Sequence, residues 1–307
     1  MCYKILITGS FGLVGTALSQ MFEAKGIKIV HFDLLATGKS FGDVRNRIQV
    51  QEAMRGCDGV IHLAAISRVL WGERDPNLCW DTNVHGLGNV LDVALEFQHS
   101  PWVIFASSRE VYGQPESLPV SEDCPVCPVN IYGRSKVKGE QLIDAVRSKG
   151  VRACTIRLSN VFGTTADHAD RVVPAFARGA ALGETLRIDG ADHTFDFTHI
   201  HDVAEGIVLL ADYLLAGKDA PPPIHFVSGQ PTTLGELAQQ AIEIADSGAN
   251  IRHAPPRTFD VAKFIGDNSR ALSILGWTPQ IPLKEGLERL IQAFREDHRG
   301  ATAGEAV

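Results

Sequence analysis

The chain lacks the features that mark several protein classes. No apolar run in its 307 residues reaches the roughly 18 residues that a membrane-spanning helix needs. Its formal net charge is -7, so it lacks the basic excess that is typical of nucleic-acid binding. The N-terminus passes directly into a strand pattern at Lys4, without the pattern of a secretory signal. We therefore expect a cytoplasmic protein with no membrane or nucleic-acid partner.

The chain is also poor in cysteine, and its six cysteines follow no disulfide pattern. Cys124 and Cys127 form a CxxC, but no second pair of ligands stands at the spacing of a zinc site. The pair does not open a helix, as a redox CxxC usually does, because prolines break the segment around it. We predict no metal site and interpret the two cysteines as inert. The alternative is a redox-sensitive loop beside an active site.

What the first half of the chain does contain is an alternation of short apolar segments and amphipathic helical patterns. The apolar segments are nearly continuous, as in parallel strands that are buried on both faces. They are Lys4–Thr8, Lys28–Phe32, Gly59–His62, Trp102–Ser107 and Arg152–Arg157. The helical patterns between them are Val14–Ala24, Gln49–Arg55, Trp80–Phe97 and Ile131–Ser148. This order predicts an α/β fold with a Rossmann-type doubly wound parallel sheet.

The second half of the chain has a looser pattern. Its helical patterns are Arg171–Ala181, His201–Leu215, Thr233–Ala245, Ser269–Leu275 and Leu283–Phe294, and its one strand pattern is Ile224–Val227. We expect residues 1–160 to form the cofactor domain, with residues of about 195–228 returning to it. Residues of about 161–194 and 229–300 would form a smaller, partly interleaved substrate domain. Residues 301–307 would form a disordered tail.

A glycine-rich turn follows the first predicted strand and leads directly into a helix. Gly9, Gly12 and Gly15 let the chain turn tightly and approach a pyrophosphate, whose charge the helix N-terminus favours. Asp33 ends the second strand, where a carboxylate can accept hydrogen bonds from both ribose hydroxyls but repels a 2′-phosphate. Since no arginine follows at the next two positions, we predict NAD rather than NADP.

Tyr132 and Lys136 form a Tyr-xxx-Lys pair on a predicted helix, where positions four apart share one face. A lysine ammonium lowers the pKa of a neighbouring tyrosine, and the phenolate can take a hydroxyl proton while a hydride leaves for NAD. Ser108 follows the fourth strand, at the edge where ligands of such folds bind, and can hydrogen-bond the same substrate oxygen. The third strand ends in Leu63-Ala64-Ala65, which is small enough to let a nicotinamide ring approach.

With these motifs the chain resembles the extended short-chain dehydrogenase/reductases, and among them the NAD-dependent nucleotide-sugar epimerase/dehydratase family. The resemblance covers about residues 4–295. It rests on the TGxxGxxG fingerprint and on further matching stretches, which are Thr8–Gly15, His62–Ala65, Thr82–Gly86, Ser107–Gly113, Tyr132–Lys136, Arg157–Gly163, Asp196–Asp202 and Leu275–Pro279.

The resemblance implies a role for each matching residue. Tyr132 would be the general base, Lys136 would hold the nicotinamide ribose, and Ser108 would bind the reacting hydroxyl. Besides Tyr132 and Lys136, the implied NAD contacts are Gly9, Phe11, Gly12, Leu13, Val14, Gly15, Asp33, Asp43, Val44, Leu63, Ala64, Ala65, Asn83, Ala106 and Ser159. The implied substrate contacts are Ser107, Asn160, Arg171, Arg187 and Arg257, with the arginines as cations for a diphosphate. For Asp43 and Arg171 the alternative is a solvated charge.

The chain departs from the family pattern in two places. Phe195 replaces an arginine that often binds the diphosphate, so either another cation binds it or the substrate is unusual. Glu110 matches a glutamate that acts in the dehydratases and decarboxylases of the family. Arg109 stands where the dehydratases carry the aspartate that protonates the leaving hydroxyl. Glu110 is therefore either an acid or base of the reaction or a charge turned away from the site.

These residues favour a nucleotide-sugar epimerase that acts at C4. Tyr132 would deprotonate the C4 hydroxyl while NAD takes the hydride, which then returns to the other face of the 4-keto sugar. The alternatives are a dehydratase or decarboxylase using Glu110, a net NAD-dependent dehydrogenase or reductase, and an NAD-sensing protein, which the intact catalytic triad disfavours. The resemblance also implies a homodimer, in which Trp80–Phe97 and Ile131–Ser148 of two chains form a four-helix bundle.

Overall fold

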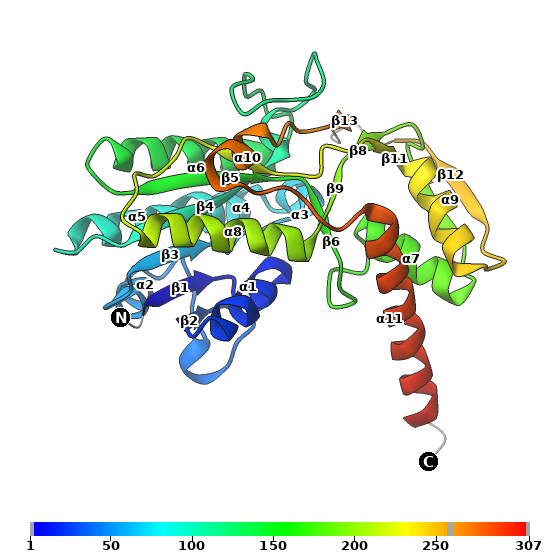
Figure 1. Ribbon diagram of the computed structural model, residues 1–307, viewed down its shortest axis with the longest axis horizontal. Helices are drawn as coiled ribbons and strands as arrows, with labels where there is room; N and C mark the ends of the chain where they lie inside the picture. Colours follow the sequence, from blue (N-terminus) through cyan, green and yellow to red (C-terminus); the bar gives the residue numbers. More distant parts are fainter. Residues whose placement is uncertain (1–2, 257–260, 305–307) are drawn as a thin grey trace.

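The larger lobe is built around a parallel sheet. The computed structural model describes residues 3–256 and 261–304. Within these residues, six parallel strands lie in the order β10-β5-β4-β3-β1-β2 (Figure 1). They are β1 (Lys4–Thr8), β2 (Lys28–Phe32), β3 (Gly59–His62), β4 (Trp102–Ser108), β5 (Ala153–Leu158) and β10 (Ile224–Phe226). The predicted Rossmann-type α/β fold is confirmed.

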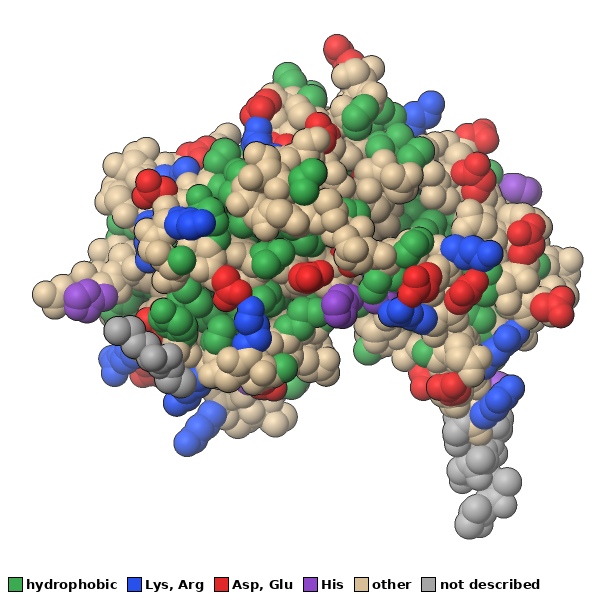
Figure 2. Space-filling view, viewed as in Figure 1, with side chains coloured by type: hydrophobic (Ala, Val, Ile, Leu, Met, Phe, Trp, Pro, Cys, Tyr) green, Lys and Arg blue, Asp and Glu red, His purple; other side chains and the backbone are tan. Residues whose placement is uncertain are grey.

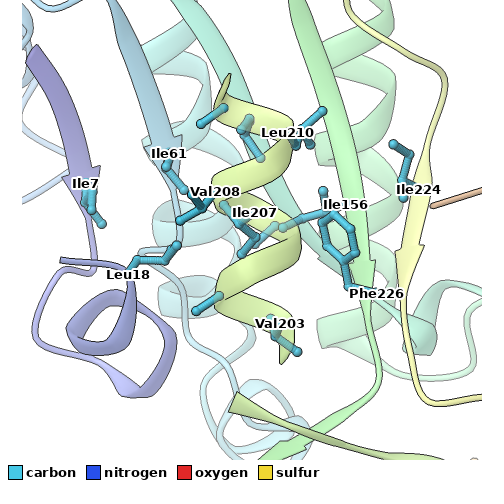
Figure 3. Close-up of a cluster of buried hydrophobic side chains, with 14 of the residues drawn as sticks. Ile7, Leu18, Ile61, Ile156, Val203, Ile207, Val208, Leu210, Ile224 and Phe226 are labelled. Carbon is cyan, nitrogen blue, oxygen red and sulfur yellow. The ribbon is translucent and has the colours of Figure 1, made fainter. Parts of the chain in front are cut away.

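Helices cover both faces of this sheet because the strands are apolar on both sides. One face carries α1 (Leu13–Ala24), α8 (Ile200–Leu215) and α10 (Ser269–Leu275), and the other carries α2 (Arg47–Met54), α5 (Gly86–Glu96) and α6 (Ile131–Arg147). Figure 3 shows the first face, where Val203, Ile207 and Leu210 of α8 pack against the sheet. The direction of strand addition reverses between β1 and β3, and the carboxyl ends of these two strands are where sheets of this kind form their ligand crevice.

The smaller lobe has a core of its own. Its helices are α7 (Val172–Leu182), α9 (Leu234–Ala245) and α11 (Leu283–Gly304). Short strand pairs accompany them: β6 (Asn160–Phe162) with β9 (Phe197–His199), β7 (Leu186–Asp189) with β12 (Ile251–Ala254), and β8 (Thr194–Phe195) between β11 (Thr232–Thr233) and β13 (Lys263–Phe264). The chain passes from β5 through β6 into this lobe and returns to the sheet through α8 and β10 (Figure 1). The lobe therefore lies beyond the carboxyl end of β5.

The predicted helix Trp80–Phe97 is interrupted. The helical run begins with α3 (Val69–Arg74) and α4 (Pro76–Trp80), continues as a π-helical turn over Asp81–His85, and ends with α5. A π turn inserts one residue and rotates the following side chains. Here it includes Asn83, which is buried and hydrogen-bonded to the segment after β3. The apolar pattern alone does not report such an insertion.

Helix α11 extends further than its apolar pattern. It continues to Gly304 and protrudes from the smaller lobe (Figure 1), so residues 301–304, expected in a disordered tail, belong to a helix. Residues 305–307 lie outside the described part. None of the helices in residues 3–256 and 261–304 is long and apolar enough to cross a membrane. On the face that Figure 2 shows, acidic and basic side chains are interspersed.

Candidate active site

The glycine turn between β1 and α1 is shaped for an anion. Gly9 has a φ of +73°, and a Cβ on it would lie 2.7 Å from the amide nitrogen of Ala64. A Cβ on Gly15 would lie 2.2 Å from the Gly9 carbonyl oxygen. Helix α1 begins after Gly12 with no side chain capping it, so its first amides are available donors. A pyrophosphate fits this turn because it needs both the donors and the close backbone approach.

Asp33 lies at the end of β2, where a ribose bound to this turn would reach. Its Oδ2 accepts a hydrogen bond from the Phe11 amide at 2.9 Å, and its Oδ1 accepts one from the Leu35 amide at 2.8 Å. These two bonds fix the carboxylate against the glycine turn. Each carboxylate oxygen retains a second acceptor site, so both can still receive ribose hydroxyls.

The loop after β2 carries Asp43 and Val44. Arg45 donates hydrogen bonds to both carboxylate oxygens of Asp43, at 3.0 and 2.6 Å, and these bonds lower the pKa of that carboxyl. Val44 is buried beside Gly86 of α5. Since Asp43 is already ion-paired, its contact with an adenine amine stays a prediction.

The segment after β3 is held from two sides. The Ala64 amide donates to Thr8 Oγ1 at 3.3 Å. Asn83 accepts from the Ile66 amide at 2.8 Å and donates to Ser135 Oγ at 2.9 Å. In this structure Asn83 fixes the segment against α6, and its predicted contact with the cofactor is untested.

Tyr132, Ser108 and Lys136 converge at the carboxyl end of β4, and all three are buried. Asn130 caps the N-terminus of α6 and thereby sets its first turn, which contains Tyr132. The Ser108 hydroxyl lies close enough to the Tyr132 hydroxyl to act on its pKa. Lys136 Nζ donates to the Ala106 carbonyl at 2.8 Å and lies 5.7 Å from the centroid of the Tyr132 ring. The predicted triad is thus assembled.

Burial controls the protonation of this triad. Burial raises the pKa of Tyr132 to about 12, although the Ser108 hydroxyl acts to lower it. Burial also lowers the pKa of Lys136 to about 8. The expected net lowering of the tyrosine pKa is wrong for this structure, because desolvation of the phenolate outweighs the attraction of nearby cations. Tyr132 is therefore protonated at neutral pH in this structure, so it can serve as a base only after it has lost its proton, and a neighbouring cation favours that loss.

Comparison with known proteins decides the family. Residues 5–222 match the model of the NAD dependent epimerase/dehydratase family. The chain belongs to this family. It is 31% identical to the UDP-glucose 4-epimerase of Rhizobium meliloti, over 91% of this chain and 93% of that protein. It is 28% identical to UDP-glucuronic acid decarboxylase 1 of Danio rerio, over 96% of this chain and 73% of that protein.

A solved structure agrees with this assignment. The crystal structure of the Thermus thermophilus UDP-glucose 4-epimerase complex with NAD matches with a TM-score of 0.85 and 25% sequence identity, over 95% of this chain and 99% of that one. The protein is therefore an enzyme of the epimerase/dehydratase family with NAD as its cofactor, as its motifs predict.

Glu110 is buried beside the triad. Its Oε2 accepts from Asn130 Nδ2 at 2.8 Å, and its charge raises the pKa of Tyr132. It is 6% exposed and its Oε2 is held by Asn130, so the alternative of a charge turned away from the site stays open. Whether it acts as an acid or base stays a prediction.

The two departures from the family pattern lie against each other. The guanidinium carbon of Arg109 is 4.4 Å from the centroid of the Phe195 ring. Arg109 also forms an ion pair with Glu110, with 3.0 Å between Nη2 and Oε1. Arg109, just after β4, thus lies beside position 195 on β8. At that position the family pattern has an arginine and this chain has Phe195.

The three predicted phosphate-binding arginines have different positions. Arg171 precedes α7, is half-buried beside Asp167, and acts to lower the pKa of Tyr132, which places it near the triad. Arg187 is exposed on β7 and pairs with Asp189. Arg257 lies outside the described residues. Of Arg171 and Arg187, both within the described residues, only Arg171 acts on the pKa of Tyr132.

Three further predicted contact residues are hydrogen-bonded within the protein. Ser107 Oγ donates to Glu140 at 2.5 Å, so its side chain faces a buried ion pair rather than the crevice. Ser159 Oγ and Asn160 Nδ2 both donate to the Asp196 carbonyl, at 3.0 and 3.4 Å. Their contacts with cofactor or substrate stay predictions, and the structure gives no support for the Ser107 side chain as a substrate ligand.

Sequence reasoning missed the bridge between the lobes. Arg68, just before α3, forms an ion pair with Asp170, just before α7, and Trp71 packs edge-on against His168 at 4.8 Å. Helix α3 also packs on the first turn of α6, near Tyr132. The sequence analysis also did not identify Asn130, although an asparagine before a helix is a capping signal. The bridge has no local signal, because its partners are about a hundred residues apart.

Proposed function

We propose that the protein is a nucleotide-sugar 4-epimerase that uses bound NAD without net oxidation or reduction. The observation that carries this proposal is that Ser108, Tyr132 and Lys136 lie together at the carboxyl edge of the sheet, the same edge that carries the glycine turn and Asp33. The names of the relatives support a UDP-hexose as the substrate.

The residues of this chain would divide the proton work. Ser108 would hold the C4 hydroxyl of the sugar, and Tyr132 would take its proton as the C–H bond breaks. Lys136, with its pKa of about 8, carries a positive charge at neutral pH that favours the phenolate form of Tyr132, which is the form that can accept this proton. NAD, when bound, accepts the hydride and returns it. Tyr132 would then give the proton back to the inverted C4 oxygen.

Elimination or decarboxylation is the second candidate, and Glu110 is the observation that favours it. A buried carboxylate beside Tyr132 can move a proton at a carbon next to the keto group. The decarboxylase among the relatives supports this candidate. The residue before Glu110 is an arginine, which cannot protonate a leaving hydroxyl at neutral pH, so dehydration is the less supported branch.

One experiment separates these candidates. The NAD-loaded enzyme is incubated in D2O with UDP-, GDP-, CDP- and dTDP-hexoses and uronates, and the products are followed by proton NMR and mass spectrometry. Epimerisation predicts an isomer of unchanged mass with no deuterium on carbon. Loss of water or CO2, or deuterium at C5 or C6, would replace epimerisation by the second candidate. A stoichiometric change in absorbance at 340 nm would indicate net redox chemistry instead.

We also propose a homodimer in which α5 and α6 of two copies pack together. Exposed Asp92 of α5 and exposed Arg134 and Lys138 of α6 support it, because a two-fold pairing of α5 with α6 would bring opposite charges together. Light scattering after gel filtration tests this: a dimer mass supports it, and a monomer mass at micromolar concentration contradicts it. The cytoplasmic location stays a prediction.

A further inference from the structure

Arg109 is a buried cation, and not all of its N–H donors have a hydrogen-bond partner in the part of the chain that the structure describes. Its side chain is 11% exposed, and its Nη2 reaches Glu110 at 3.0 Å. Its Nη1 is buried and has no hydrogen-bond partner among the described residues. A guanidinium carries five N–H donors, and leaving them unpaired away from water is costly. The position therefore favours a ligand that brings acceptors.

The surroundings of Arg109 define the direction from which such a ligand comes. Phe195 covers one face of the guanidinium at 4.4 Å. The donors lie in the plane of the group, and a carboxylate binds two of them at once along that edge. An acceptor-only, planar group is thus a better match than a hydroxyl, which offers one oxygen.

The nearby carboxylates, Glu110 and Asp196, do not pair with all of the N–H donors of Arg109. Glu110 offers one oxygen to Arg109 and gives the other to Asn130. Asp196, which Arg109 attracts, directs its Oδ2 to the Gly266 amide at 2.8 Å, and burial raises its pKa to about 6. Asp196 thus directs this oxygen to a backbone amide, and the described part of the chain shows no hydrogen bond between it and Arg109.

The position of Arg109 in the site determines which group of the bound substrate lies near it. Arg109 directly follows Ser108, and its partner Glu110 acts electrostatically on Tyr132. The reacting hydroxyl lies at Ser108 and Tyr132. In a hexose, the substituent of C5 is next to C4, whereas the diphosphate is attached across the ring at C1. The two carbons bonded to C4 are C3 and C5, and of these only C5 carries a carboxylate, in a uronate. The C5 carboxylate is therefore the group beside the reacting hydroxyl that matches the unpaired donors of Arg109.

From this geometry we propose that Arg109 binds a carboxylate at C5 of the sugar, so that the enzyme takes nucleotide uronates in preference to neutral nucleotide hexoses. This inference rests on the proposed function, because it assumes that C4 lies at Ser108 and Tyr132. It names the substrate class of the same site.

Calorimetry on the full-length, NAD-loaded protein tests it with three ligands: UDP-glucuronate, UDP-glucose and UDP. We expect the wild-type protein to bind UDP-glucuronate about 10- to 100-fold more tightly than UDP-glucose, the range of a hydrogen-bonded charge. Arg109→Gln should remove most of this preference and leave the affinity for UDP within a few-fold. Arg178→Gln, which removes an exposed arginine paired with Glu184, is the matched control and should keep the preference.

Several results would overturn the proposal. Equal wild-type affinities for the two sugars would do so. A loss in Arg109→Gln that is equal for all three ligands would assign the arginine to the diphosphate, and an unchanged preference with a lower melting temperature would assign it to folding alone. If Arg109→Gln does not fold, Arg109→Lys keeps the charge but not the fork, and it should lose part of the preference; an undiminished preference contradicts the proposal.

The proposed function fails separately from this inference. A uronate preference without epimerisation of any sugar would keep Arg109 as a carboxylate ligand and remove the 4-epimerase. Epimerisation of UDP-glucose without a uronate preference would keep the 4-epimerase and remove the role of Arg109.

Discussion

The crevice has two halves that are built in different ways. The half that receives the dinucleotide is made of backbone: a glycine turn, the free amides of α1 and a carboxylate fixed by two amides. The half that we propose to face the sugar is made of side chains from distant segments, including Ser108 at the end of β4, Tyr132 on α6 and Phe195 on β8. The first half has little freedom to change, because a Cβ at Gly9 or Gly15 collides with backbone.

The difference explains where this chain departs from its family. A replaced side chain in the sugar half can change what is bound without disturbing the backbone. Arg109 and Phe195 lie there in contact with each other. Our proposals thus assign cofactor binding to local backbone geometry and substrate choice to contacts between segments. Changes in each half should therefore affect different measurements.

The largest effect is expected from Tyr132→Phe. The variant lacks the hydroxyl that exchanges the proton, so kcat should fall by about 10³-fold or more. NAD binding, read by fluorescence, should stay within a few-fold of wild type because the dinucleotide half is intact. Tyr213→Phe on α8 is the control and should retain activity. Residual turnover within tenfold of wild type would contradict the role of Tyr132.

A smaller effect, confined to the other half, is expected from Asp33→Asn. Loss of the charge weakens hydrogen bonds to the ribose hydroxyls, so the Kd for NAD should rise about 10- to 100-fold. At saturating NAD, kcat should change much less than in Tyr132→Phe. Asp92→Asn, an exposed change on α5, is the control. An unchanged Kd for NAD would remove Asp33 from the cofactor site.

The smallest effect is expected at His62, where the two halves meet. Its Nδ1 lies 3.0 Å from Thr8 Oγ1, next to the glycine turn, and the charge of Lys136 also acts on it. Burial lowers the pKa of His62 to about 3, below the 6.5 of an unfolded histidine. Between these values the unfolded chain binds a proton that the folded chain does not. Stability is therefore full above about pH 6.5 and is lost as the pH falls, by about 1 kcal/mol per pH unit.

Urea unfolding between pH 7 and pH 5 measures this loss. His225, whose pKa burial lowers to about 4, contributes a similar slope. His62→Asn should remove about half of the combined slope, and it should be less stable than wild type at pH 7 because one buried contact is altered. An unchanged slope in His62→Asn would show that His62 is not the buried neutral group described here.

The sequence predicted one half of the crevice better than the other, and for the same physical reason. Periodicity and glycine spacing are local, and they gave the five strands of the first half of the chain to within one residue at either end. The π turn at Asp81–His85 is not predicted by periodicity, because it depends on what Asn83 contacts. The pairing of Arg68 with Asp170 and the stacking of Arg109 on Phe195 join segments far apart in the chain. Such contacts form only when the chain folds. The sequence therefore showed which residue types stand at these positions but not which residues pair.

In the proposed reaction, Tyr132 takes and returns the proton of the C4 hydroxyl, and NAD takes and returns the hydride of C4, without net redox change. Turnover of a nucleotide sugar that carries deuterium at C4, followed by NMR and mass spectrometry of the product, tests this most directly. A 4-epimerase should give an inverted C4 that retains the deuterium, with no lasting change in absorbance at 340 nm. A product that has lost the C4 deuterium, or one that is lighter by water or CO2, would rule this reaction out.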